Sequence, residues 1–167
     1  FIHISSMSVH GPAPTEADTD ESTATIGHYG EPYSDSKAAQ ELAVQVAMKH
    51  GLRGLILRPT VVYGPGSPFV RQVVNDASLG RITLVDGGSG RCNAVFVDDV
   101  CEAIEMALHA DPANGEAVFI NGDASVTWGE FIHAFSMDVT PAPTIRQVES
   151  TAPLDEPAGP PRSGLMS

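Results

Sequence analysis

The chain has 167 residues, of which 42% are hydrophobic, and this is enough for one domain with a substantial core. Its formal net charge of −12 argues against nucleic acid and anionic membrane surfaces as partners, because both require a positive patch. A small anionic ligand is compatible with this charge, since it needs only a local positive field or a helix N-terminus.

No apolar run is long enough to cross a bilayer, and no signal peptide is recognisable. The two cysteines, Cys92 and Cys101, suit a reducing compartment, so we expect a cytoplasmic protein. They could form a disulfide, although nothing in the sequence requires one. Cys101 falls on an apolar helical face and is expected in the core. With no Cys/His cluster, the sequence predicts no metal site.

The first part of the chain predicts a strand, a polar loop and a helix. Residues 1–4 are strand-like, and residues 12–30 are rich in polar, Gly and Pro residues typical of a loop. Apolar residues then recur at three- and four-residue spacing, which predicts an amphipathic helix over residues 34–50. Pro32 favours the start of this helix, and Gly51 is suited to its C-terminal end.

Strands and helices alternate in the remainder of the chain as far as residue 135. We expect strands at 54–57, 82–85, 93–97 and 117–120, and helices at 69–79, from an Asp98 or Asp99 cap to about 109, and from a Thr127 cap to about 135. Glu130 stands at the capping-box position of the last helix. This alternation predicts an α/β fold with a parallel sheet and covering helices.

Repeated prolines interrupt every element after Met137. We therefore divide the chain into a structured domain, residues 1–136, and a Pro-rich tail, residues 137–167, that is expected to be disordered.

Two residues one helical turn apart suggest acid–base chemistry. Tyr33 and Lys37 lie on the same face of the predicted helix, so both can point at one small volume. An ammonium beside a phenol favours the phenolate, and such a phenol can accept or donate a proton. The hydroxyls of Ser5 and Ser6 follow the first strand and could hydrogen-bond the same reacting oxygen.

Several motifs, in this order, resemble those of the extended short-chain dehydrogenase/reductases, the NAD-dependent epimerase/dehydratase group. They are Ile-Ser-Ser-Met-Ser-Val-His-Gly at 4–11, where His10 replaces the usual Tyr; Tyr-Ser-Asp-Ser-Lys at 33–37; Arg-Pro-Thr-Val-Val-Tyr-Gly-Pro-Gly at 58–66; Val-Phe-Val-Asp-Asp-Val at 95–100; and residues 115–131 with Trp-Gly-Glu-Phe. The resemblance covers residues 1–135 and the C-terminal half of that family's domain. It implies a partial Rossmann-like parallel sheet with covering helices plus a small substrate-binding lobe.

The resemblance also implies roles for single residues. Tyr33 would be the general acid/base, Lys37 would hydrogen-bond the nicotinamide ribose, and Ser6 would hydrogen-bond the substrate oxygen. The residues implied for NAD or NADP are Ser5, Tyr33, Lys37, Pro59, Thr60, Val61 and Val62. Those implied for the substrate are Ser6, Ser8, Val61 and Arg91.

The implied activity is that of an NAD(P)-dependent epimerase, dehydratase or reductase acting on a nucleotide-sugar-like or other hydroxyl-bearing substrate. Arg91 is one residue out of step with the Arg of the nucleotide-sugar branch, where Cys92 stands here, and this weakens the assignment of a nucleotide sugar. A homodimer through the helix carrying Tyr33 is implied as well. Arg58 is expected to pair with an acid rather than to contact substrate, and Tyr63 and Trp128 to line the core or a pocket.

The family's glycine-rich dinucleotide loop has no counterpart in this sequence. Without earlier strands, the strand at residues 1–4 would have an unpaired edge. We expect the chain to be a fragment of a longer gene product. The alternatives are a truncated relative that pairs with itself or a second chain, and a copy without activity that serves as a binding or structural module.

Overall fold

The computed structural model describes residues 1–11, 19–25, 27–110, 115–137, 139–140 and 143–149. The elements in chain order are β1 (Ile2–Ile4), η1 (Met7–His10), α1 (Pro32–Lys49), β2 (Leu55–Pro59), β3 (Val61–Tyr63), α2 (Pro68–Ser78), β4 (Thr83–Val85), η2 (Asp86–Gly88), β5 (Arg91–Cys92), β6 (Ala94–Phe96), α3 (Val97–His109), β7 (Ala117–Ile120), β8 (Val126–Thr127), α4 (Trp128–Ser136) and β9 (Arg146–Val148).

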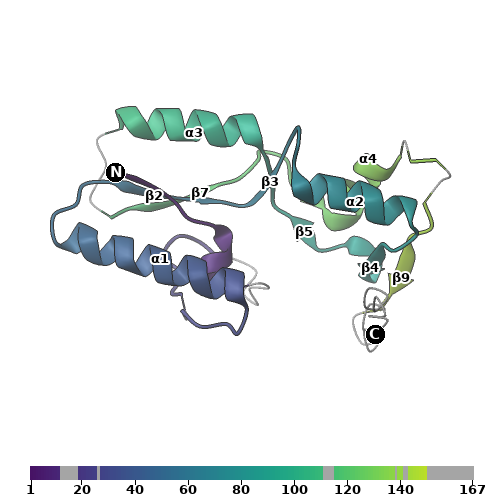
Figure 1. Cartoon of the computed structure of the whole chain (residues 1–167), viewed down its shortest axis with the longest axis horizontal. Helices are drawn as coiled ribbons and strands as arrows, with labels where there is room; N and C mark the ends of the chain where they lie inside the picture. The colour runs from purple at the N-terminus through teal and green to yellow at the C-terminus, as the bar shows by residue number, and fades with distance from the viewer. Residues whose placement is uncertain (12–18, 26, 111–114, 138, 141–142, 150–167) are drawn as a thin grey trace, which may run out of the picture.

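The molecule is elongated, with a layered part at one end and a smaller lobe at the other (Figure 1). In the layered part, β1, β2 and β7 form a parallel sheet in the order β1-β2-β7. Helix α1 lies on one side of this sheet and α3 on the other (Figure 1). All five residues of β2 are buried, as expected of a central parallel strand covered on both faces. The predicted α/β fold is therefore confirmed.

Strand β1 forms one edge of this sheet. Within the described part of the chain it pairs only with β2, through Ile2 beside Leu55 and Ile4 beside Leu57. Phe1 and Ile4 are 62% and 40% exposed, so apolar side chains accompany the unpaired backbone. The open edge predicted for residues 1–4 is present in this structure.

The small lobe contains α2, α4 and three short two-stranded pairings. Strand β3 pairs with β6 and β4 with β9, both in parallel, whereas β5 and β8 are antiparallel. One buried cluster is formed by Val73, Ala77, Ile82 and Leu84, and another by Cys92, Ala94 and Phe131. Phe135 of α4 packs against both clusters and so joins the two halves of the lobe core.

The capping prediction is confirmed for α4 and wrong for α3. Thr127 and Glu130 form a complete capping box at the start of α4. In contrast, α3 begins directly after β6, and its N-cap is Phe96, which has no side-chain cap. Asp98 and Asp99 therefore lie in the first helical turn, where negative charge still interacts favourably with the helix dipole.

Two other expectations are corrected. Cys101 is exposed on α3 rather than part of the core. Residues 146–148 of the tail form β9 on β4, and Ile145 packs against the lobe core. Prolines flank this strand but do not fall inside it, so backbone pairing remains feasible. Positions 138, 141–142 and 150–167 of the predicted tail lie outside the described residues.

None of the helices in the described ranges combines the length and apolar character needed to span a lipid bilayer.

Candidate functional site

The carboxyl end of β1 meets the N-terminal half of α1. The Lys37 ammonium donates a hydrogen bond to the Ile4 carbonyl, with an Nζ–O distance of 3.2 Å. Ile4 is the last residue of β1, and Ser5 and Ser6 follow it directly. The structure therefore brings Lys37 next to the two serines that the sequence places at the strand end.

The three candidate serines have different environments. The Ser6 hydroxyl caps η1 by accepting the Ser8 backbone N–H at 3.2 Å, and the residue is 7% exposed. The Ser5 hydroxyl instead donates to the Glu41 carboxylate at 2.5 Å. Because the chain turns into η1 at Met7, Ser8 does not continue the strand, so strand alternation does not place Ser8 on the same side as Ser6.

Tyr33 lies at the start of α1, one turn before Lys37. The Glu31 side chain caps this helix by accepting the backbone N–H groups of Tyr33 at 3.0 Å and Ser34 at 2.7 Å. The hydrogen bonds from Ser34 and Tyr33 lower the pKa of the Glu31 carboxyl. Tyr33 itself is 53% exposed, and its hydroxyl has no hydrogen-bond partner within the described residues. The phenol is thus accessible from solvent.

Glu41, one helical turn after Lys37 on α1, forms a buried ion pair with Arg58. The Glu41 carboxylate accepts hydrogen bonds from Arg58 Nε at 3.2 Å and Arg58 Nη2 at 2.6 Å, in addition to the Ser5 hydroxyl. Glu41 and Arg58 are only 2% and 3% exposed. Burial alone raises the pKa of Glu41, but the hydrogen bonds from Arg58 and Ser5 outweigh it, so the pKa is lowered. The expected acidic partner of Arg58 is therefore Glu41.

His10 extends this network on the other side of Arg58. Arg58 Nη1 lies 3.2 Å from His10 Nε2, and because a guanidinium can only donate, Nε2 accepts and His10 is the neutral tautomer with its proton on Nδ1. Burial and the neighbouring Arg58 lower the pKa of His10. The Phe119 ring covers both groups, with its centroid 5.7 Å from Arg58 Cζ and 5.6 Å from the His10 ring centroid.

The Pro59–Val62 run leaves the same edge of the sheet as Ser5 and Ser6. Ser5 is beside Leu57 of β2, since its N–H donates to the Leu57 carbonyl at 2.7 Å. The N–H and hydroxyl of Thr60 both donate to the Ile120 carbonyl, at 3.1 and 3.2 Å. This run is thereby fixed at the carboxyl ends of β2 and β7, where ligands bind in open α/β sheets.

Arg91 does not join this group. It is exposed on β5, opposite Thr127 of β8, in the small lobe (Figure 1). The candidate site residues therefore fall into a set at the sheet edge and one residue in the lobe.

Glu41 is the residue that sequence reasoning missed. It stands four positions after Lys37, so helical spacing places the two on one face of α1. A single acid in an otherwise apolar helical stripe was the available signal, together with the expectation that Arg58 needs a buried partner.

Comparisons with known proteins agree with the motifs. The model of the NAD dependent epimerase/dehydratase family matches residues 1–120. The chain is 30% identical over 114 residues to 2-alkyl-3-oxoalkanoate reductase of Stenotrophomonas maltophilia, covering 63% of this chain and 34% of that protein. It is also 31% identical over 120 residues to a trifunctional UDP-glucose 4,6-dehydratase/UDP-4-keto-6-deoxy-D-glucose 3,5-epimerase/UDP-4-keto-L-rhamnose-reductase of Arabidopsis thaliana, covering 65% of this chain and 17% of that protein.

Solved structures share the fold. UDP-glucuronic acid 4-epimerase from Bacillus cereus, in complex with NAD, superimposes with a TM-score of 0.73 at 23% identity, over 89% of this chain and 49% of that one. DesIV, a dTDP-glucose 4,6-dehydratase from Streptomyces venezuelae with NAD bound, superimposes with a TM-score of 0.67 at 25% identity, over 89% of this chain and 47% of that one. The chain thus spans about half the length of these enzymes, and a smaller share of the curated relatives.

The buried ion pair predicts a specific pattern in a double-mutant cycle. Glu41→Leu and Arg58→Leu should each lower the free energy of unfolding by about 3–5 kcal/mol, because each leaves one buried charge unpaired. The double variant should lose much less than the sum of the two, and urea denaturation followed by circular dichroism measures all three.

Glu105→Leu is the matched control, since Glu105 is an exposed acid on α3 and its loss should change stability by less than about 0.5 kcal/mol. If a single variant is unfolded outright, recovery of a folded double variant demonstrates the same coupling. Strictly additive losses would contradict the account of the pair.

Proposed function

Because the chain belongs to the NAD dependent epimerase/dehydratase family, we propose that it carries the catalytic half of an NAD(P)-dependent epimerase, dehydratase or reductase acting on a hydroxyl-bearing, nucleotide-sugar-like substrate. The observation that carries this proposal is the hydrogen bond from Lys37, one helical turn after the accessible Tyr33, to the Ile4 carbonyl, two residues before Ser6. The resemblance implied these three residues, and the contact of Lys37 with the end of β1 supports the proposal.

In this proposal Tyr33 exchanges a proton with the substrate. Its phenolate accepts the proton of a substrate hydroxyl while the adjoining carbon loses a hydride, and the same phenol returns the proton in the reverse direction. The Ser6 hydroxyl accepts one hydrogen bond from Ser8 and keeps its own proton free to donate to that substrate oxygen.

Lys37 supplies positive charge to the same volume. With its ammonium held by the Ile4 carbonyl, it retains two further N–H donors for a ribose hydroxyl and for the Tyr33 oxygen. Its charge would interact favourably with the negative charge that the Tyr33 oxygen carries during proton transfer. NAD or NADP, when bound, supplies the hydride acceptor, and Lys37 together with the Pro59–Val62 run would hold its nicotinamide end.

A second candidate function is a non-catalytic binding or structural module. It is supported by the edge of β1, which pairs only with β2 in the described part of the chain and carries the exposed side chains of Phe1 and Ile4. A strand edge of this kind can pair with another strand and so form an interface.

Titration calorimetry with NAD and with NADP separates the two functions for this chain. The enzymatic proposal predicts saturable binding of one dinucleotide, weakened by Lys37→Met because a ribose contact and a positive charge are lost. Lys49→Met, at the far end of the same helix, is the matched control and should not change affinity. Heat signals absent for both dinucleotides would reject catalysis by this chain alone and favour the module.

Tyr33→Phe tests the chemical role in any preparation that binds the dinucleotide. Removing the phenolic oxygen should lower turnover of UDP-glucose or dTDP-glucose by about 10²–10⁴-fold, because the proposed proton acceptor is lost. The absorbance of the reduced nicotinamide reports the reaction. Tyr29→Phe, which removes only a hydroxyl that donates to the Val9 carbonyl, should retain most activity. Turnover persisting in Tyr33→Phe would reject the assignment of the general acid/base.

A further inference from the structure

An open pocket lies at the junction of β3, β6, α2 and α4, away from the predicted catalytic residues. Its volume is about 430 Å³, within the range of small-molecule sites. Its lining includes neither Ser6, Tyr33 nor Lys37. The pocket thus forms a separate concavity that the proposed function does not use.

Three aromatic rings from three different elements form its main wall. Tyr63 of β3 lies edge-on to Phe96 of β6 at a centroid distance of 5.4 Å and to Phe135 of α4 at 6.0 Å. Both pairs have interplanar angles above 60°, so ring edges and faces alternate along the wall. Such a wall can make both stacked and edge-to-face contacts with a planar ligand ring.

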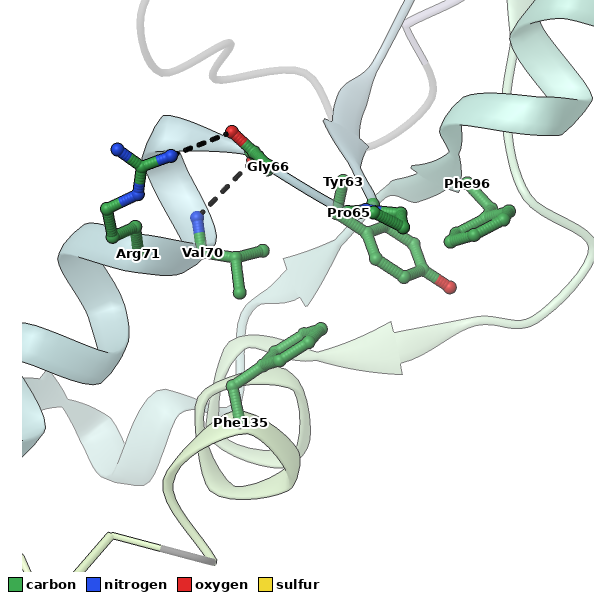
Figure 2. Close-up of a pocket in the computed structure, with 9 residues that line it drawn as sticks. Tyr63, Pro65, Gly66, Val70, Arg71, Phe96 and Phe135 are labelled. Atoms are coloured by element: carbon green, nitrogen blue, oxygen red, sulfur yellow. Dashed lines mark hydrogen bonds between the residues drawn. The ribbon is translucent and has the colours of Figure 1, made fainter.

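The opposite rim carries a positive charge. In Figure 2, Gly66 and Val70 lie between Arg71 and the aromatic rings. Arg71 Nη2 donates to the Gly66 carbonyl at 3.3 Å, which orients the guanidinium at the rim. Within the described part of the chain Arg71 makes no ion pair, so its other N–H groups can serve a ligand.

The charge at this rim is unusual for the molecule. The chain has a net charge of −12, yet none of the residues lining the pocket is acidic. An anion at this rim would therefore meet no carboxylate among the lining residues, and the Arg71 guanidinium could form charge-assisted hydrogen bonds with it.

We propose that this pocket binds a planar aromatic group with an anionic substituent, the ring lying against Tyr63, Phe96 and Phe135 and the anion at Arg71. Neither the aromatic ring nor the anionic group alone is expected to bind tightly. The aromatic wall provides apolar contact without charge, and a single exposed guanidinium binds an anion only weakly.

The test uses 1-naphthyl phosphate, with 1-naphthol and inorganic phosphate as its two halves, in calorimetric and ¹H–¹⁵N NMR titrations of the whole chain. We expect 1-naphthyl phosphate to bind roughly three- to fivefold more tightly than 1-naphthol, which corresponds to about 0.6–1 kcal/mol, and also more tightly than inorganic phosphate. The amide shifts should centre on Tyr63, Gly66 and Val70. Equal affinity for 1-naphthol and its phosphate ester would overturn the role of the charge, and shifts elsewhere would overturn the site.

Two variants separate the ring contacts from the charge. Arg71→Gln should weaken 1-naphthyl phosphate by roughly three- to fivefold, the size of one exposed ion pair, without changing 1-naphthol affinity. Phe96→Leu should weaken both aromatic probes. Arg81→Gln removes an exposed arginine that does not line the pocket and should change neither. Equal losses in Arg71→Gln and Arg81→Gln would indicate general charge attraction and overturn the proposal.

Discussion

The ion pair between Glu41 and Arg58 is the interaction on which the arrangement of the candidate site depends. Glu41 belongs to α1, Arg58 to β2, and the Ser5 hydroxyl that Glu41 also accepts follows β1. Tyr33 and Lys37 belong to α1, Ser5 and Ser6 follow β1 directly, and Pro59 ends β2. Because both charges are almost fully buried, each needs the other to offset its loss of hydration, and the three elements cannot shift independently without breaking that pairing.

The position of Lys37 follows from this anchor. Glu41 and Lys37 are one helical turn apart, so fixing Glu41 against Ser5 brings the Lys37 ammonium to the carbonyl of the preceding residue, Ile4. The helix start is fixed separately by the Glu31 cap, which places Tyr33 one turn earlier and leaves it exposed. A reactive side chain on a helix or strand, supported by packed and hydrogen-bonded neighbours, is positioned more accurately than one on a loop.

Much of this fold could be predicted from local patterns. The strand at residues 117–120 matches β7, and the helices that carry Tyr33 and Phe135 were predicted within two residues of their ends. The strands β3, β5, β8 and β9 were not predicted, because segments of two or three residues carry little periodicity and are specified largely by tertiary pairing. Cys101 shows another limit of prediction from sequence, because a periodic apolar face of a helix does not reveal whether another element covers that face.

The candidate site was accessible to sequence reasoning only in part. Spacing put Tyr33 and Lys37 on one helical face, but the partner that aligns them, Glu41, is defined by contacts with residues 36 and 17 positions away. The aromatic pocket likewise joins residues from positions 63 to 135, and no local motif connects Tyr63 with Phe135. Long-range geometry of this kind appears only once the chain is folded.

The central claim is that α1 holds the Lys37 ammonium against the end of β1. Lys37 and Lys49 are the two lysines of the chain, so acetylation rates measured by mass spectrometry compare them directly within one helix. The account predicts that Lys37 reacts several-fold more slowly than Lys49 in the folded protein, because its amine is engaged with the Ile4 carbonyl, and that the difference disappears in urea. Equal rates for the two lysines in the folded protein would contradict it.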